Sequence, residues 1–484
     1  MIAASGFRDY DARWLYPAQI DIAGMEAVGL GLGTQMHRRG LRPEIVTGHD
    51  FRAYSAEVQA ALIAGLIRAG IKVRDIGMAL TPMAYFAQIH LGAPAVAMVT
   101  ASHNPNGWTG VKIGFGAPLT HGPDEMAELR EIVLGGGGEA RPGGGREAVP
   151  GLAAAYAQDL TRGVRLSRPL RLVCATGNGT AGAFAPDILA RIGAEVVPLH
   201  TALDADFPHY NPNPEAMEML HDMAQAQRQA AADLALGFDG DGDRCGVVDD
   251  RGEEIFADKL GLLFARDLAA RHLGAHFVAD VKSTGLFASD PVLAAAGCTV
   301  EYWKTGHSHM KRRVRETGAL AGFEKSGHHI FAPPLGHGYD CALRVAVELC
   351  RLLDRSGAKL SDLRAALPHS FASPTLSPAC PDGDKRAVLA RIVARLQALA
   401  AQGGTLGQRR IERVVTVDGA RVMLAGGGFA LVRASSNTPN LVVVCESLQS
   451  RAELRAIFDD LDRVIRSEPE VGAYDQALEP GARS

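Results

Sequence analysis

The chain has 484 residues, of which 47% are apolar, and a formal net charge of -4. It is too long for one hydrophobic core, so we expect two to four globular domains rather than a disordered chain. Because no long basic block occurs, nucleic acid is not expected as the main partner. Any anion binding must therefore come from local sites.

Signals for export or membrane insertion are missing from the sequence. The seven cysteines are scattered, and none forms a C-x-x-C pair. Their odd number is typical of reduced thiols rather than of a disulfide scaffold or a zinc site. Arg8, Asp9 and Asp11 precede any apolar signal-like stretch. No window offers about 18 uninterrupted apolar residues, so we expect a cytoplasmic protein without a membrane span.

Helical and strand patterns alternate along the chain. Ser55 is a plausible N-cap, followed by Val58, Leu62 and Leu66 at helical spacing. Short apolar runs predict buried strands, at residues 95–100, 170–175, 234–238 and 276–281. The alternation favours α/β layers.

Three stretches indicate domain boundaries. Residues 135–145 are nearly all glycine, which is typical of a linker or a surface loop. A hairpin is predicted where residues 245–248 and 253–256 flank a turn at 249–252. The third stretch is proline-rich, with prolines at 368, 374, 378 and 381. We therefore expect four domains, at residues 1–147, 148–253, 254–369 and 370–484.

The last of these domains has a different pattern from the first three. It combines a helix at 385–400 with strand-like runs at 414–417 and 441–445. The sequence contains no short tandem repeat.

Ser102 lies in the segment Thr100-Ala-Ser-His-Asn-Pro105, at the end of a predicted strand and before a strong turn signal. A serine at such a position is accessible to a substrate, although an ordinary turn serine would give the same pattern. His103 is adjacent, but neighbouring side chains rarely face each other, and the G-x-S-x-G motif of hydrolases is absent.

Asp239, Asp241 and Asp243 alternate with glycines after the apolar run 234–238. Two glycines permit a tight loop that points three carboxylates at one place, where their repulsion calls for a cation. Hard oxygen ligands favour magnesium or calcium. An EF-hand counted from Asp239 would need Gly and Glu where Arg244 and Asp250 stand, so that interpretation fails. A solvated acidic turn is the alternative.

Two further loops carry weaker signals. Residues 322–328 place Glu324 and Ser326 two positions apart, suited to sugar hydroxyls, with His328 able to move a proton. Residues 433–439 concentrate a guanidinium, three hydroxyls and an amide, which are donors for a phosphate. Each segment by itself would equally suit an ordinary polar turn.

Taken in order, these loops resemble the α-D-phosphohexomutase family, in particular its phosphomannomutase/phosphoglucomutase branch. The resemblance covers nearly the whole chain. Besides the four loops it includes the segments at 7–13, 48–52, 110–113, 280–284 and 303–308. It implies three related α/β domains with mixed sheets and a C-terminal α+β domain around a central cleft.

The resemblance also implies roles for particular side chains. Ser102 is similar to the family's phosphoserine, and Asp239, Asp241 and Asp243 to its magnesium ligands, with the Ser102 phosphate supplying another oxygen. The other catalytic candidates are Arg13, His103, Lys112, Arg244 and His328, with His328 or Lys112 as the general base. The substrate-binding candidates are Tyr10, Lys282, His307, Glu324, Ser326, Arg433, Ser435, Ser436, Asn437 and Thr438.

The chain departs from the family pattern at a few positions. Trp14 and Phe323 stand where glycine is usual, and Lys325 where methionine is frequent. Ser436-Asn437-Thr438 replaces the usual order of the last loop. The resemblance therefore does not decide between mannose and glucose.

The implied activity interconverts hexose 6-phosphate and hexose 1-phosphate, of mannose and/or glucose, through a phosphoserine enzyme and a hexose 1,6-bisphosphate. It implies Mg²⁺, glucose or mannose 1,6-bisphosphate as activator, and a monomer without nucleic-acid or membrane partners. Two alternatives remain open: a metal-dependent sugar phosphatase, and a non-catalytic sugar-phosphate-binding homologue. The phosphoglucosamine mutase branch is disfavoured, because it has Asp-Gly-Asp-Ala-Asp-Arg where this chain has glycine at 242.

Overall fold

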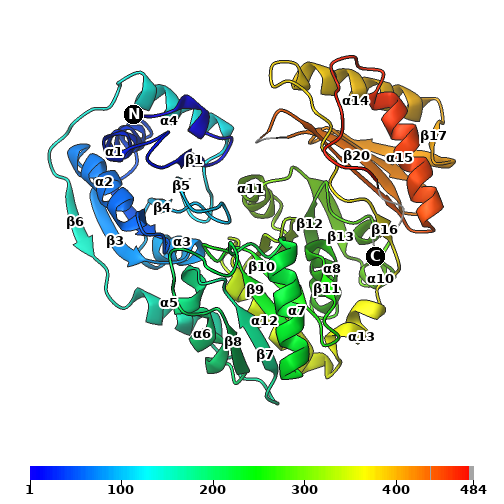
Figure 1. Cartoon of the computed structure of the whole chain (residues 1–484), viewed down its shortest axis with the longest axis horizontal. Helices are drawn as coiled ribbons and strands as arrows, with labels where there is room; N and C mark the ends of the chain where they lie inside the picture. The colour runs from blue at the N-terminus through cyan, green and yellow to red at the C-terminus, as the bar shows by residue number, and fades with distance from the viewer. Residues whose placement is uncertain (436–437, 479–484) are drawn as a thin grey trace. The chain divides into compact units, whose positions relative to one another are not determined.

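The computed structural model describes residues 1–435 and 438–478 (Figure 1). It contains two compact units, each made of two separate stretches of the chain. Unit 1 comprises Met1–Ala257 and Ser326–Leu363. Unit 2 comprises Asp258–Lys325 and the described residues from Arg364 onward. The chain therefore passes between the units three times.

Unit 1 begins with a mixed six-stranded sheet in the order β1-β5-β4-β2-β3-β6. Strands β2, β3, β4 and β6 run parallel, while β5 is antiparallel to both β4 and β1. Strand β4 is buried along its whole length, as expected for a central strand covered on both faces. The strands are β1 (Ala12–Leu15), β2 (Glu44–His49), β3 (Lys72–Met78), β4 (Ala95–Val99), β5 (Trp108–Phe115) and β6 (Gly145–Ala148).

Helices α1 and α2 cross at very close range beside this sheet. A β-carbon on Gly29 would lie 2.1 Å from the Leu62 carbonyl oxygen, and one on Gly65 would lie 2.0 Å from that of Glu26. The two glycines thus allow backbone to touch backbone. A core cluster joins α1, α2 and α4 to the sheet. The helices of this region are α1 (Ile22–Arg38), α2 (Ser55–Arg68), α3 (Thr81–His90), α4 (Pro123–Leu134) and α5 (Leu152–Thr161).

The second sheet of unit 1 has the order β11-β10-β9-β7-β8. Strands β8, β7 and β9 are parallel, and β10 and β11 are antiparallel additions. Its strands are β7 (Arg171–Ala175), β8 (Glu195–Leu199), β9 (Leu234–Phe238), β10 (Cys245–Val248) and β11 (Glu254–Ile255). The remaining elements of unit 1 are α6 (Ala185–Arg191), α7 (Met217–Ala230), β15 (His329–Phe331) and α12 (Ala342–Ser356).

Unit 2 contains three parallel strands and, later in the chain, an antiparallel sheet. Strand β12 (His276–Asp280) pairs with β13 (Thr299–Trp303) and β14 (Ala321–Phe323). The helices here are α8 (Ala257–Ala269), α9 (Leu286–Ser289), α10 (Pro291–Ala295) and α11 (His307–Thr317), where α8 begins on the last residue of unit 1. Helix α13 (Leu360–Ala365) spans the third passage between the units.

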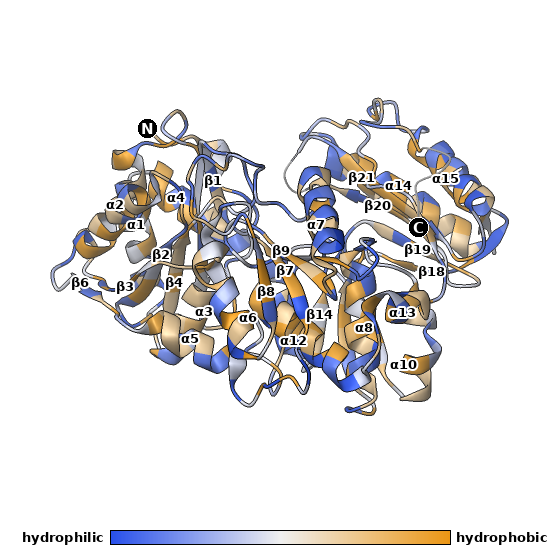
Figure 2. Cartoon of the chain, turned by 60° about the horizontal axis from the view of Figure 1, so that its bottom comes forward, coloured by the Kyte–Doolittle hydropathy of each residue, from blue (hydrophilic) through white to orange (hydrophobic). Residues whose placement is uncertain are grey.

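The C-terminal sheet of unit 2 has the order β16-β21-β20-β19-β18-β17 and is antiparallel throughout. Its strands are β16 (Phe371–Ala372), β17 (Thr405–Leu406), β18 (Arg409–Val415), β19 (Ala420–Leu424), β20 (Phe429–Ala434) and β21 (Leu441–Ser447). Helices α14 (Lys385–Ala401) and α15 (Arg451–Ile465) cover one face and share its core. Figure 2 shows hydrophobic residues concentrated in β20 and β21, beside helices that also carry hydrophilic residues.

The architecture expected from the sequence, with mixed α/β sheets and a C-terminal α+β domain, is confirmed. All four predicted buried strands form, and so does the hairpin between β10 and β11. The glycine-rich stretch is a surface loop that leads from α4 to the edge strand β6 of the same sheet. The strand predicted at 414–417 begins earlier, at Arg409, and ends at Val415.

The predicted N-cap is wrong. Ser55 is the first residue of α2, and the cap position is Tyr54, which makes no side-chain cap bond. The Ser55 hydroxyl instead donates to Asp50 Oδ1 at 2.5 Å, so a longer-range contact has displaced the local capping bond. All seven cysteines, which lie in the described part of the chain, are free thiols. Among the described residues, no helix combines the length and apolar character needed to cross a bilayer.

Candidate active site

Ser102 lies three residues beyond the end of β4 and is almost fully buried, so the accessibility expected from its sequence position is not found. Its φ angle is 52°, in the left-handed region that residues other than glycine seldom adopt. Its backbone N–H donates to Thr100 Oγ1 at 2.8 Å. This conformation also brings the Ser102 Oγ within 3.3 Å of His103 Nδ1. The two neighbouring side chains therefore do approach each other, contrary to our expectation.

The three aspartates lie in the loop between β9 and β10, and none is exposed to solvent. The Asp239 side chain closes the loop, because its Oδ1 accepts from the backbone N–H groups of Asp243 and Arg244, both at 3.1 Å. Gly242 has a φ of 73°, which glycine adopts without strain. One oxygen from each aspartate lies within 4.8 Å of one from each of the other two.

The serine loop and the aspartate loop meet directly. The Ser102 Oγ lies 3.4 Å from Asp239 Oδ2, although 137 residues separate them in the chain. Backbone contact accompanies this approach, since a β-carbon on Gly240 would lie 2.4 Å from the Ser102 carbonyl oxygen. The structure thus brings the predicted nucleophile and the predicted metal ligands together.

Lys112, on β5, supplies positive charge inside the carboxylate cluster. Its Nζ donates to Asp241 Oδ2 at 2.8 Å and to Asp243 Oδ2. Burial by itself would lower the pKa of Lys112, but the charges of Asp241 and Asp243 raise it well above its usual value. Burial, together with the charges of Asp243 and Asp241, raises the pKa of Asp239 to about 7. The cluster is therefore short of positive charge.

The donor set fits a divalent cation. Oδ1 of Asp241 and Oδ1 of Asp243 are buried and accept no hydrogen bond from any described residue. Buried carboxylate oxygens without donors are costly, and a hard cation would satisfy them. The three carboxylates are thus suited to Mg²⁺ or a similar oxygen-seeking ion.

Arg244 borders the cluster on the side of Asp239. Its Nε donates to Asp239 Oδ2 at 3.1 Å, and its Nη1 to Glu215 at 2.8 Å. The charge of Arg244, burial and the charge of Arg13 lower the pKa of His103, so that its imidazole is neutral. Arg13 itself is held by Asp11, at 2.8 Å. Burial lowers the pKa of Arg13, but the charge of Asp11 raises it, and the neighbouring Tyr10 would add to this effect only when ionised.

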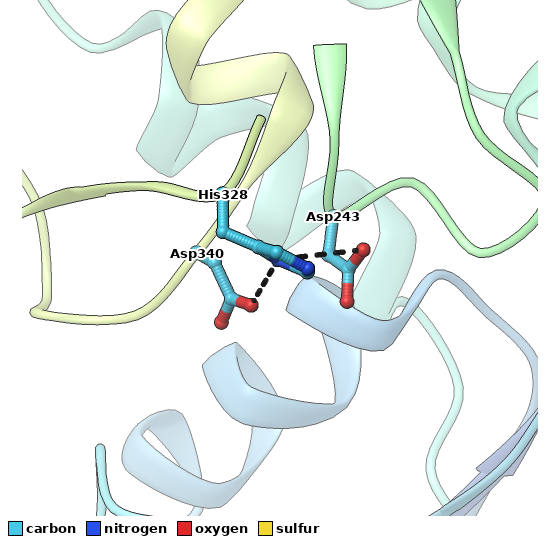
Figure 3. Close-up of side chains that lie close together, drawn as sticks. All are labelled: Asp243, His328 and Asp340. Carbon is cyan, nitrogen blue, oxygen red and sulfur yellow. Dashed lines mark hydrogen bonds and ion pairs between the residues drawn. The ribbon is translucent and has the colours of Figure 1, made fainter. Parts of the chain in front are cut away.

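His328 lies between the carboxylates of Asp243 and Asp340 (Figure 3). Its Nδ1 is 2.9 Å from Asp340 Oδ2 and 3.8 Å from Asp243 Oδ1. Because an ionised carboxylate can only accept, Nδ1 carries a proton and donates it to Asp340. Ser326 also belongs to unit 1, where its carbonyl oxygen lies 3.5 Å from Arg244 Nη1.

Three other substrate-binding candidates, Glu324, His307 and Lys282, belong to unit 2. Glu324 is buried and accepts from the Gly306 N–H at 3.0 Å. His307 is the first residue of α11 and is also buried. Lys282 follows β12 and is partly exposed. The predicted sugar loop thus contains the chain's passage from unit 2 to unit 1, between Lys325 and Ser326.

The predicted phosphate loop, residues 433–439, begins with the last two residues of β20 in unit 2. Arg433 Nε donates to Asp418 Oδ2 at 2.8 Å, and the Thr305 N–H donates to the same oxygen at 3.2 Å. Ser435 Oγ accepts from the Thr438 hydroxyl at 2.8 Å. The remaining two candidates, Ser436 and Asn437, lie outside the described residues.

Sequence reasoning missed several residues that hold these loops. Asp340 orients His328, and Asp418 accepts from both Arg433 and the Thr305 backbone N–H. Lys385 ties the phosphate loop through the carbonyl oxygens of Ser435 and Thr438, at 2.8 and 3.1 Å. Nothing local marks these residues. Asp50 and Arg52 hold the serine loop and did carry a signal, because they stand in the 48–52 segment of the resemblance.

Comparison with known proteins adds independent evidence. Four domain families described as phosphoglucomutase/phosphomannomutase match the chain in order. Three are alpha/beta/alpha domains I, II and III, at residues 4–136, 154–252 and 256–371, and the fourth is the C-terminal domain, at 379–464.

Individual proteins give the same result. A phosphomannomutase/phosphoglucomutase of Pseudomonas putida is 33% identical over 466 residues, covering 96% of each chain. A phosphoglucomutase of Neisseria gonorrhoeae is 33% identical, covering 96% of this chain and 97% of that protein. A crystal structure of a family protein from Burkholderia thailandensis superposes with a TM-score of 0.87 at 32% identity, covering 96% of this chain and 98% of that one. The chain therefore belongs to the phosphoglucomutase/phosphomannomutase family.

Proposed function

We propose that this protein is a phosphohexomutase that interconverts the 6-phosphate and the 1-phosphate of a hexose, mannose or glucose, through a phosphoserine at Ser102. Its relatives are named phosphomannomutase/phosphoglucomutase or phosphoglucomutase, and the chain matches them over nearly their whole length. The observation that carries the proposal is the 3.4 Å approach of the Ser102 Oγ to Asp239 Oδ2. An alcohol held beside a buried carboxylate cluster suits phosphoryl transfer better than a structural turn.

The reaction consists of two transfers in opposite directions. In the first, the bond from phosphorus to the Ser102 Oγ breaks as a bond forms to the free sugar hydroxyl; the hydroxyl proton goes to a base, and the released Ser102 oxygen takes up a proton. The product is a hexose 1,6-bisphosphate. After the sugar has turned over, the Ser102 hydroxyl gives up its proton and receives the other phosphoryl group, and the released sugar oxygen takes up a proton. Phosphoryl transfer depends mainly on alignment and on charge stabilisation.

Asp239, Asp241 and Asp243 are the residues that would hold Mg²⁺. When bound there, the ion would offset the negative charge that builds up on the transferring group and on the serine oxygen. Lys112, Arg244 and Arg13 add positive charge around the same place. We further propose that a hexose 1,6-bisphosphate acts as activator by phosphorylating Ser102.

Between the two candidate bases, we propose His328. Lys112 is committed to Asp241 and Asp243, and its raised pKa keeps it protonated. His328 Nδ1 contacts Asp340, whose carboxylate would stabilise the imidazolium that forms when the ring takes up the hydroxyl proton. His307, Glu324, Ser326, Lys282 and Tyr10 are proposed sugar or phosphate contacts. The loop 433–438 is proposed to hold the phosphate that is not transferred.

We further propose domain boundaries at 147, 253 and 369, a cytoplasmic location and a monomeric state. They rest on composition and on the family resemblance.

The decisive variant is Ser102→Ala. It removes the phosphate acceptor, so we expect mutase turnover to fall by at least about 1,000-fold. Mannose 1-phosphate and glucose 1-phosphate should be assayed separately, with Mg²⁺ and catalytic glucose 1,6-bisphosphate. The ratio of the two kcat/KM values gives the hexose preference. Intact-mass measurement should find one phosphate on the wild-type protein and none on the variant.

Ser167→Ala is the matched control, because Ser167 is an exposed loop serine of unit 1 that bonds to Asp354. It should keep full activity. Normal turnover in Ser102→Ala would refute the covalent role. Release of phosphate faster than isomerisation would favour the phosphatase, and a Ser102 that never carries phosphate would favour the binding protein.

A further inference from the structure

The segment Gly48–Arg52 has a structural role that the proposed chemistry does not use. Strand β2 ends at His49, and Asp50 and Arg52, which follow it, contact the serine loop. The Asp50 and Arg52 side chains are both about 2% exposed and form an ion pair at 3.3 Å. A buried arginine needs several acceptors to offset its loss of hydration.

Arg52 finds its acceptors in the serine loop. Its Nη2 donates to the carbonyl oxygens of Ser102 at 3.0 Å and Asn104 at 2.7 Å. Its Nη1 donates to that of Pro105 at 3.2 Å. One planar guanidinium thus spans three carbonyls within four residues. Lysine cannot copy this, because its ammonium is a single point on a flexible stem.

Asp50 holds the other side of the loop. Its Oδ2 accepts from the Thr100 hydroxyl at 2.9 Å and from the Ala101 N–H at 3.2 Å. Its Oδ1 accepts from the Ser55 hydroxyl, which fixes the carboxylate to the start of α2. Asp50 therefore anchors both Arg52 and the residues that lead into Ser102.

The geometry of Ser102 explains why such an anchor is needed. A left-handed conformation costs a serine free energy, and it persists only where surrounding contacts impose it. In this conformation the Oγ lies beside Asp239. The proposed reaction moves a phosphoryl group off this oxygen and back onto it, so the oxygen must return to one position in every cycle.

We propose that Arg52, anchored by Asp50, is a positioning residue that sets the rate of phosphoryl transfer at Ser102 by fixing the backbone of its loop. This inference rests on the proposed function. Arg52 acts through the loop carbonyls, so it should affect the transfer step and leave the binding of the hexose phosphate alone.

The test compares Arg52→Lys and Arg52→Met with the wild type. We expect kcat to fall by about 10-fold in the lysine variant and about 100-fold in the methionine variant, because a displacement of about 1 Å costs that much. KM for the hexose 1-phosphate should stay within about twofold of the wild-type value. The rate constant for transfer from ³²P-labelled enzyme to hexose phosphate should fall in parallel in a single turnover. Misfolding alone would lower only the amplitude.

Arg42→Gln is the matched control. Arg42 also donates to a loop carbonyl in unit 1, that of Gly92 at 2.7 Å, but it is exposed. It should keep wild-type kinetics. An unchanged single-turnover rate constant in Arg52→Lys and Arg52→Met, or a raised KM at unchanged kcat, would overturn the inference. If Arg52→Met does not fold, the kcat and the single-turnover rate constant of Arg52→Lys alone test the inference. A wild-type protein that transfers no phosphate from Ser102 would overturn the proposed function as well, so the two failures are distinguishable.

Discussion

At the scale of single residues, Lys112 supplies much of the positive charge that balances the buried aspartates. It is a buried ammonium that contacts two fully buried carboxylates, those of Asp241 and Asp243, while Arg244 contacts the third, that of Asp239. Three carboxylates at 0% exposure would not coexist without such partners. Although burial opposes ionisation, Lys112 and His328 hold the pKa of Asp243 below its usual value. Burial and the charges of Asp243 and Asp241 raise the pKa of Asp239 to about 7.

Lys112→Gln should therefore destabilise the metal-free protein. Removing one partner of a buried ion pair leaves uncompensated charge, at a cost of about 3 kcal/mol in the free energy of unfolding. Added Mg²⁺ should recover part of the loss, because it supplies the missing positive charge. Urea denaturation in EDTA and in excess Mg²⁺ measures both effects. The control is Lys72→Gln, an exposed lysine on β3 of the same sheet. A change below about 0.5 kcal/mol in Lys112→Gln would contradict this account.

At the scale of elements, the site is made where the loop after β4 meets the loop after β9. Each strand is short, apolar and buried, so its end is fixed by the core. The polar residues that follow are consequently presented at defined positions. The two loops touch through backbone at Gly240, where even a methyl group has no room.

Gly240→Ala should separate the two loops. The added carbon would lie 2.4 Å from the Ser102 carbonyl oxygen, which is backbone and cannot rotate away. We expect kcat to fall by about 100-fold and unfolding free energy to fall by about 1–3 kcal/mol. Steady-state kinetics and thermal denaturation measure the two effects. Gly145→Ala, where a β-carbon meets nothing within 4 Å, should change neither. Wild-type kcat in Gly240→Ala would show that the loops tolerate separation.

At the scale of the whole molecule, the described chain forms two compact units. Asp239, Asp241 and Asp243 all lie in unit 1, and so does Lys112. Of the three tryptophans, Trp14 and Trp108 belong to unit 1 and Trp303 to unit 2. Compact units with separate cores can unfold in separate steps, and a ligand stabilises the unit that binds it.

Mg²⁺ should accordingly stabilise the two units unequally. In a Trp14→Phe, Trp108→Phe variant, fluorescence reports on Trp303 and hence on unit 2. We expect saturating Mg²⁺ to leave the urea midpoint of this signal unchanged. The transition of unit 1, followed by circular dichroism, should move up by about 0.5 M or more, which corresponds to about 1 kcal/mol at ordinary m-values. Equal shifts of both signals would mean that the units unfold as one body.

Much of the fold was predictable from local pattern. Apolar runs gave the strands at 234–238 and 276–280, because a buried strand needs little beyond continuous apolar residues and a turn on each side. Edge strand β6 (Gly-Arg-Glu-Ala) was missed because it is mostly exposed and polar. The Ser55 cap was wrong because a hydroxyl near a helix start can bond either to the helix or, as here, to a distant carboxylate.

The sequence by itself determined which residues we propose for the chemistry, since Ser102 and the three aspartates stand in short segments whose residue types and spacing are local properties. Only the tertiary structure decided how they act on one another. It places the Ser102 Oγ next to Asp239, 137 residues later in the chain. It also places Asp340 beside His328 and Asp50 beside the serine loop, and it buries Lys112 among carboxylates. Contact and dielectric environment depend on every element packed around a side chain, and no local segment of the sequence contains that information.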